Sequence, residues 1–286
     1  MSLGSVLTAA VTPFDDQLNV NEEAFVALLA FLAANGSDGA VVCGTTGEAS
    51  TLSDEEHLRV IELVVESRPA KDFTITAGTG SNDTRHAVHL TERATELGVD
   101  ATLSVTPYYN KPNQAGVRRH YEEISKATDK PIVLYNIPSR VVVDLPNEFL
   151  AELAQIEHVE YLKQANNNNL ELIDGLGIYA GNDDLFARAL DIGALGGILV
   201  ASHIVGPQMQ QMVNEPNRRA AIDSELQPVY DAMGVTTNPI PVKKSLQLLG
   251  HEVGGLRLPM VEADAEQTAQ IKAVLDSSGL LTGAAS

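Results

Sequence analysis

The chain has 286 residues, of which 44% are hydrophobic and 20% are charged, a composition typical of a globular protein with a sizeable core. Its 38 acidic and 19 basic residues give a formal net charge of −19, which argues against nucleic acid and anionic membrane surfaces as partners, because both attract a basic face. Cys43 is the only cysteine, so no intrachain disulfide can form, and we expect a cytoplasmic protein. We expect no secretory signal, and no apolar run approaches the ~20 residues of a membrane span.

Eight short runs rich in Val, Ile, Leu and Thr predict strands that are buried on both faces. In chain order they are residues 6–11, 39–44, 73–77, 101–106, 131–136, 159–164, 178–181 and 197–201. Amphipathic stretches between them predict helices at residues 22–35, 84–97, 113–128, 146–154 and 183–192, and a further helix opens at the capping box of Ser53 and Glu56. Eight strands that alternate with helices favour a closed, parallel (β/α)8 barrel, and an open doubly wound sheet is the alternative.

The pattern changes after the eighth strand. Residues 207–233, 241–249 and 264–275 predict helices with no strand between them. The 286 residues also exceed the ~250 that are typical of a (β/α)8 barrel. We therefore expect an α/β fold, a TIM barrel over residues 1–224, with a helical C-terminal extension over residues 225–286.

Lys163 stands out because, among the eight lysines, it alone lies inside an apolar strand pattern. It also falls near the C-terminal end of its strand, where a barrel carries its reactive groups. Desolvation lowers the pKa of a lysine, and a neutral amine can attack a ketone to form an imine. A lysine that pairs with a buried carboxylate, or that reaches solvent along its apolar stem, is the alternative.

Neighbouring strand ends offer groups suited to such chemistry, each with a purely structural alternative. Tyr135 is suited to relay a proton during imine formation, or to fill the barrel mouth as an aromatic. Residues 45–47, Thr-Thr-Gly, are suited to form an anion nest, or an ordinary turn. Arg140 is suited to hold a carboxylate, or to form a surface ion pair. His86 and His89 lack a third ligand, so we expect no metal site.

The ordered set of strand-end motifs resembles that of the dihydrodipicolinate synthase family of pyruvate Schiff-base lyases. The motifs are GTTGE at 44–48, VTPYYNKP at 105–112, YNIPSR at 135–140, Lys163, GND at 181–183 and NPIPVK at 238–243. The resemblance implies a reaction that joins pyruvate to L-aspartate-4-semialdehyde and gives 4-hydroxy-tetrahydrodipicolinate, at the opening of diaminopimelate and lysine biosynthesis. It also implies a homotetramer built as a dimer of tight dimers, with no metal or organic cofactor.

The same resemblance implies four catalytic residues. Lys163 is similar to the lysine that forms the Schiff base with pyruvate. Tyr135 resembles the tyrosine that relays protons, together with Thr45 and Tyr109. The resemblance places Tyr109 in the active site of the neighbouring subunit.

It implies four substrate-binding residues as well. Thr46 resembles the residue that holds the pyruvate carboxylate, Arg140 the residue that holds the semialdehyde carboxylate, and Gly181 and Leu199 complete the set. Sialic-acid lyases and 2-keto-3-deoxy sugar acid aldolases share the lysine and tyrosine but generally lack the arginine, so Arg140 favours the semialdehyde. A non-catalytic barrel protein is a further alternative, and a metal-dependent aldolase is disfavoured because no His, Asp or Glu ligand set stands at the strand ends.

The chain departs from the family pattern beside two of these residues. Val141-Val142 occupies the place of a usual Thr-Gly pair after the arginine, and Gln164 occupies the place of a usual acidic residue after the lysine. We expect these changes to affect substrate preference more than imine chemistry.

A candidate effector site for lysine departs further. Three of its residues match the family pattern, namely His57, Asn82 and Tyr108. Three others differ, with Ala49, Asp54 and His86 in place of a serine, a histidine and a glutamate. Loss of the glutamate removes an anionic partner for the effector's ammonium, a contact worth about 1.5–3 kcal/mol. We therefore expect weak or absent inhibition by lysine.

Overall fold

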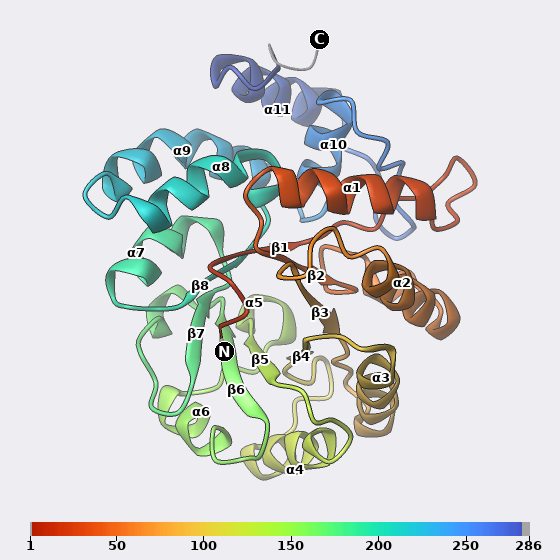
Figure 1. Ribbon diagram of the computed structural model, residues 1–286, viewed down its shortest axis with the longest axis vertical. Coiled ribbons are helices and arrows are strands. Elements are labelled where there is room, and N and C mark those ends of the chain that lie inside the picture. The colour runs from red at the N-terminus through yellow and green to blue at the C-terminus, as the bar shows by residue number, and fades with distance from the viewer. Residues whose placement is uncertain (1, 282–286) are drawn as a thin grey trace.

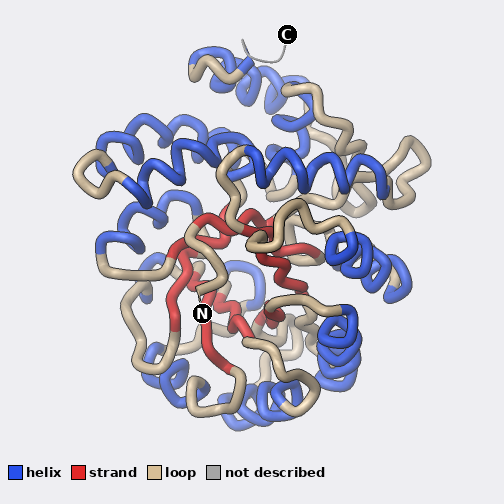
Figure 2. Tube along the Cα trace, viewed as in Figure 1, coloured by secondary structure: helices blue, strands red, loops and turns tan. Residues whose placement is uncertain are grey.

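The computed structural model describes residues 2–281, and its centre is a closed barrel of parallel strands. The strands are β1 Val6–Ala9, β2 Gly39–Val42, β3 Thr74–Gly78, β4 Ala101–Val105, β5 Ile132–Asn136, β6 Val159–Gln164, β7 Gly177–Ala180 and β8 Gly196–Leu199. Each strand pairs with the next one along the chain, and β8 closes the barrel on β1. Figure 2 shows the strands gathered inside a ring of helices. The predicted (β/α)8 barrel is therefore confirmed.

Helices follow the strands in alternation and cover the outside of the barrel (Figure 1). They are α1 Glu22–Ala34, α2 Asp54–Glu66, α3 Thr84–Leu97, α4 Gln114–Ser125, the single turn α5 Pro138–Val141, α6 Asn147–Leu153, α7 Phe186–Asp191 and α8 Ser202–Asn214. Short 3-10 turns, at Ala49–Thr51, Asn167–Asn169 and Asp183–Leu185, follow β2, β6 and β7. The capping box is confirmed, because the Ser53 side chain accepts from the Glu56 amide while the Glu56 carboxylate accepts from the Ser53 amide.

Three further helices, α9 Arg219–Met233, α10 Ile240–Leu248 and α11 Ala265–Ser277, complete the described chain. In Figure 1, α10 and α11 lie outside the ring, beyond α1. The expected division of the chain at residues 224 and 225 falls inside α9 and stays a prediction. The helical character of the C-terminal part is confirmed.

The single helix expected at residues 207–233 is wrong. The structure divides it into α8, which already begins at Ser202, and α9, which begins at Arg219. Pro216 explains the break, because its ring disfavours helical backbone angles at the residue before it. Glu215 accordingly has φ −123° and ψ 70°, outside the helical region.

Side chains of the strands face two cores. Alternate residues fill the inside of the barrel, and the others pack beneath the helices. In β5, Val133 and Tyr135 point inward, whereas Ile132 and Leu134 point to the helices. This alternation explains why the strands read as continuous apolar runs, and it brings Tyr135 to the barrel interior.

Candidate active site

Lys163 lies near the C-terminal end of β6 and is 5% exposed. It pairs in register with Tyr135 of β5, and its Nζ atom lies 4.4 Å from the centroid of the Tyr135 ring. Burial lowers the pKa of Lys163 to about 8, although the negative charge of Asp183 opposes the shift. An amine with this pKa is partly neutral near pH 7, which is the state that attacks a carbonyl carbon.

Tyr135 places an aromatic ring with a phenol hydroxyl beside this amine. Burial raises the pKa of Tyr135 to about 12, and the charge of Arg140 opposes the shift. The phenol therefore keeps its proton at neutral pH and can both donate and accept a hydrogen bond. A hydroxyl of this kind beside a neutral amine is suited to relay protons.

Asp183 is the last residue of the GND motif at 181–183, and the motif alone implied no individual role for it. Its carboxylate accepts hydrogen bonds from the Val200 and Ala201 amides, at 2.9 and 3.0 Å, and so connects the end of β7 to the exit of β8. Desolvation raises the pKa of Asp183 to about 6. Its place after β7, on the catalytic face of the barrel, agrees with its inclusion in the GND strand-end motif.

The turn after β2 carries Thr45 and Thr46, and its backbone is constrained. Cys43 and Glu48, on either side of the turn, both have φ 53°, a left-handed conformation that is uncommon for residues other than glycine. The Thr12 hydroxyl donates to the Gly47 carbonyl at 2.7 Å. Thr45 is exposed, whereas Thr46 is buried and its Oγ1 accepts a hydrogen bond from Asn238 Nδ2 at 2.9 Å.

Glu48 and Lys243 form a buried ion pair beside this turn. Glu48 is 4% exposed and Lys243 is 1% exposed, and Lys243 Nζ lies 2.6 Å from Glu48 Oε1. The amine also donates to the Gly255 carbonyl at 2.7 Å and lies 4.2 Å from the centroid of the Phe14 ring. The apolar strand pattern did not reveal this second buried lysine, which lies in helix α10. A lysine paired with a buried carboxylate was the alternative for Lys163, and it describes Lys243.

Arg140 lies in α5 at the mouth of the barrel, where its Nη2 donates to the Asn238 carbonyl at 3.3 Å. Thr45, Tyr135, Arg140 and Asn238 line one cavity of about 490 Å³. Three predicted site residues, Thr45, Tyr135 and Arg140, therefore share one cavity, whereas Lys163 and Thr46 are not among the residues that line it.

Gly181 and Leu199 lie at the ends of β7 and β8. A side chain at 181 would meet Ala165 Cβ at 2.7 Å, so the backbone comes close here only because the residue is glycine. The Leu199 side chain is fully buried in the core beneath the helices, and its carbonyl accepts from the Ser202 hydroxyl at 3.2 Å. The structure therefore assigns the Leu199 side chain to packing.

The candidate effector residues share this cavity, which Ala49, His57, His86 and Tyr108 also line. His86 Nε2 lies 3.0 Å from Asp54 Oδ1, and His57 Nε2 lies 2.8 Å from the Gly78 carbonyl oxygen. Asn82 is adjacent, and its carbonyl accepts from Asn110. Asp54, beside this pocket, is thus already paired with His86.

Tyr109 is separated from the other predicted catalytic residues. Its side chain is 88% exposed, and its backbone has φ 72°, in the left-handed region. The loop after β4 therefore presents a phenol on the surface of the chain.

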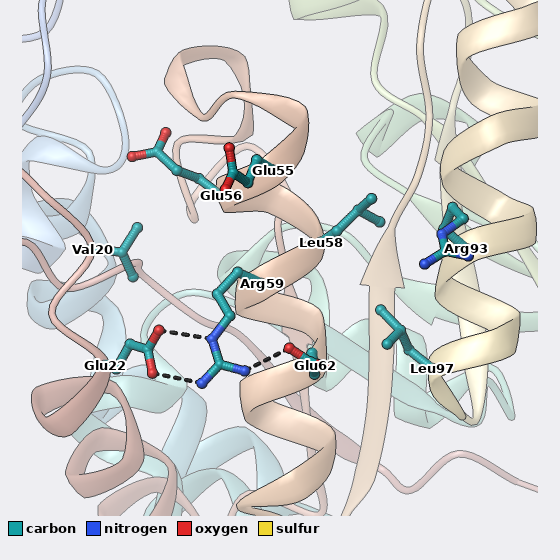
Figure 3. Close-up of a pocket in the computed structure, with 9 residues that line it drawn as sticks. All are labelled: Val20, Glu22, Glu55, Glu56, Leu58, Arg59, Glu62, Arg93 and Leu97. Carbon is teal, nitrogen blue, oxygen red and sulfur yellow. Dashed lines mark hydrogen bonds and ion pairs between the residues drawn. The ribbon is translucent and has the colours of Figure 1, made fainter.

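A second cavity of about 490 Å³ lies outside the barrel, between α1, α2 and α3 (Figure 3). Arg59 crosses it and pairs with Glu22 at 2.7 Å and with Glu62 at 2.6 Å. None of the predicted site residues lines it. Arg59 thus pairs with two of the four glutamates that line the cavity, and we assign the cavity no chemistry.

Residues 2–281 contain no group of three or more His, Cys, Asp or Glu side chains placed to hold a metal ion. Within the same residues, no helix combines the length and the apolar character that a membrane crossing requires.

Comparison with known proteins gives a consistent result. The model of the Dihydrodipicolinate synthetase family matches residues 2–278. The chain is 43% identical to 4-hydroxy-tetrahydrodipicolinate synthase 2 of Halalkalibacterium halodurans, over 96% of this chain and 98% of the relative. It is 40% identical to the 4-hydroxy-tetrahydrodipicolinate synthase of a Synechococcus species, over 98% and 95%. The solved dihydrodipicolinate synthase of Cyanidioschyzon merolae, with lysine bound, is similar with a TM-score of 0.94 and 36% identity, over 98% and 99% of the two chains.

Proposed function

The chain belongs to the dihydrodipicolinate synthetase family, and from this premise we propose that Lys163 forms a Schiff base with pyruvate and adds it to L-aspartate-4-semialdehyde. The activity is that of a lyase, 4-hydroxy-tetrahydrodipicolinate synthase, as the names of the relatives support. The observation that carries the assignment of Lys163 is a buried amine with a pKa of about 8 beside a protonated phenol. The sugar-acid lyases and the non-catalytic barrel are not favoured by any of these relatives.

Imine formation requires an amine, a proton relay and the loss of water. The neutral Lys163 amine adds to the ketone carbon of pyruvate, and Tyr135 carries a proton to the departing hydroxyl, so that water leaves and the imine forms. Loss of a proton from the methyl carbon gives an enamine, which attacks the aldehyde carbon of the second substrate. The amino group of that substrate then attacks the imine carbon, closes the ring and releases Lys163.

The two carboxylates of the substrates need separate partners on a chain of net charge −19. The Thr46 hydroxyl and the adjacent backbone amides of the turn hold the carboxylate of pyruvate, and Thr45 supports the proton relay. Arg140 at the cavity mouth holds the carboxylate of the semialdehyde. Gly181 leaves room at the end of β7, and Leu199 contributes through its backbone at the end of β8, since its side chain packs beneath the helices.

Assembly completes the relay in this proposal. The exposed phenol of Tyr109 enters the active site of a second copy and joins Tyr135 and Thr45 there. Two such dimers form a homotetramer. We place this biosynthetic enzyme in the cytoplasm, and we propose that it needs no metal or organic cofactor.

Borohydride trapping tests the proposed function. Reduction in the presence of pyruvate should add one pyruvate-derived group to Lys163, and mass spectrometry of the digested protein should find it there. A Lys163→Ala variant should take up no such group. A chase with L-aspartate-4-semialdehyde should remove the trappable imine, whereas turnover of sugar acids alone would contradict the proposal, as would an adduct on any other lysine.

A further inference from the structure

Asn238 connects the two groups to which we assign carboxylate binding. It lies just before α10, in the C-terminal part of the chain. Its side-chain Nδ2 donates to Thr46 Oγ1 at 2.9 Å, while its backbone carbonyl accepts from Arg140 Nη2 at 3.3 Å. One residue from outside the strands thus contacts both ends of the proposed substrate site.

The direction of the Asn238–Thr46 hydrogen bond has a chemical consequence. An amide NH₂ can only donate, so Thr46 Oγ1 is the acceptor and the single hydroxyl hydrogen of Thr46 stays available. Among residues 2–281, Asn238 is the hydrogen-bond partner of this hydroxyl. A buried hydroxyl that already accepts a hydrogen bond is a stronger donor to the next acceptor in the chain.

We propose that Asn238 is a positioning residue that directs the Thr46 hydroxyl hydrogen to the carboxylate of pyruvate and so sets the affinity for pyruvate. The inference rests on the proposed function. It assigns the hydrogen-bond chain from the Asn238 amide through the Thr46 hydroxyl to the substrate carboxylate. Asn238 does not touch the reacting carbon and acts through Thr46.

The surroundings hold both partners in place. Two residues beyond Thr46, Glu48 forms its buried ion pair with Lys243, which lies in the helix that Asn238 precedes. Lys243 is fixed in turn by the Gly255 carbonyl. The turn after β2 and the start of α10 are therefore joined twice, once by the ion pair and once by the Asn238–Thr46 hydrogen bond.

Two substitutions of Asn238 distinguish the effect of the hydrogen-bond direction from the effect of side-chain size. In Asn238→Asp the side chain keeps its size, but its carboxylate accepts from the Thr46 hydroxyl and repels the carboxylate of the substrate. We expect the pyruvate concentration for half-maximal trapping on Lys163 to rise about 100-fold in Asn238→Asp and about 10-fold in Asn238→Ala, as for the loss of a hydrogen bond to a charged group. The melting temperature should stay close to that of the unaltered chain. Asn217→Asp, at an exposed position after α8, is the control for added charge and should leave the trapping curve unchanged.

A double-mutant cycle tests whether Asn238 acts through Thr46. In a Thr46→Val background, Asn238→Ala should have no further effect on the trapping curve, because the hydroxyl that it orients is gone. An unchanged curve for both Asn238 variants would overturn the inference, and so would an equal effect of Asn238→Ala with and without the Thr46 hydroxyl. If Asn238→Ala does not fold, Asn238→Leu, which is of similar size, uncharged and without a donor, carries the same comparison. If the unaltered chain forms no adduct with pyruvate, that result contradicts the proposed function itself.

Discussion

The described chain has two buried lysines, Lys163 and Lys243, whose surroundings differ. We infer different roles for them from this difference. Lys243 lies 2.6 Å from Glu48, and the charge of Glu48 opposes the burial that lowers the pKa of Lys243. Lys163 contacts the face of an aromatic ring, and its one nearby anion, Asp183, is itself held by two backbone amides. Burial without a bonded carboxylate is what makes an amine available for covalent chemistry.

The rate of imine formation should follow the ionisation of Lys163. Burial lowers the pKa of this amine to about 8, so the neutral fraction, and with it the rate of adduct formation with pyruvate, should rise about tenfold per pH unit below that value and level off above it. Rapid-quench borohydride trapping between pH 6 and pH 9 measures this profile. Asp183→Asn should move the inflection to lower pH, because Asp183 favours the charged amine. A rate that still rises tenfold per pH unit up to pH 9 would show that the pKa of the amine is not lowered.

Val142 has a backbone conformation that its side chain disfavours. It ends α5 with φ 69° and is 63% exposed. A β-branched residue pays about 1–2 kcal/mol in the left-handed region, whereas glycine adopts it freely. Val142→Gly should therefore raise the melting temperature by a few degrees in calorimetry. The neighbouring Val143→Gly is the control, since it removes a partly buried side chain and should lower the melting temperature; a lower value for Val142→Gly would contradict the argument.

At the level of elements, α10 supports the candidate active site even though it lies outside the barrel ring. The Lys243–Glu48 pair connects it to the turn that carries Thr45 and Thr46. Removing one partner of a buried pair leaves an uncompensated charge, which costs about 3–5 kcal/mol. The position of the turn therefore depends on a helix that follows the eighth strand.

Lys243→Met should lower the free energy of unfolding by about 3–5 kcal/mol in urea titrations. The adjacent Lys244→Met is the matched control, because Lys244 pairs with Glu262, whose side chain is 54% exposed, and such pairs contribute about 0–1 kcal/mol. The double variant Glu48→Gln with Lys243→Met should recover part of the loss. Equal losses of unfolding free energy at positions 243 and 244 would show that the buried pair stabilises the fold no more than the exposed pair does.

The effector pocket supports a prediction about inhibition. Asp54 at the start of α2 lies 3.0 Å from His86 of α3, so a histidine already contacts one of its carboxylate oxygens where the family usually has a glutamate. Lysine should therefore inhibit weakly or not at all, in titrations of the condensation rate. The double variant Asp54→His with His86→Glu restores the usual arrangement of the family and should gain inhibition. Strong inhibition of the unaltered chain below millimolar lysine would contradict this prediction.

Periodicity and composition predicted those elements whose signals are local. All eight strands, the capping box of Ser53 and the place of Lys163 were visible because alternation, caps and strand-end position depend on neighbours in sequence. The break at Pro216 was missed because the apolar pattern continues across it. The Asn238–Thr46 contact joins residues 192 positions apart, and the burial of Lys243 depends on a tertiary partner, so neither leaves a periodic signal.

At the level of the whole molecule, charge and assembly act against each other. A chain with net charge −19 repels its own copies at long range, and this repulsion weakens as salt screens it. In the proposed assembly, association comes from short-range contacts, among them the exposed phenol of Tyr109. A site that draws one group from a second subunit depends on that association for activity.

Mixing inactive subunits tests this dependence. In a dimer of one Lys163→Ala subunit and one Tyr109→Phe subunit, a single site receives Lys163 from the second subunit and Tyr109 from the first. Co-expression of the two should therefore restore up to about a quarter of the unaltered activity, while each variant alone stays nearly inactive. Lys163→Ala mixed with Tyr135→Phe is the control and should restore nothing, because Lys163 and Tyr135 pair within one barrel. If mixed dimers form, as affinity tags on each subunit can verify, and the first mixture still shows no recovery, then Tyr109 does not act across the interface.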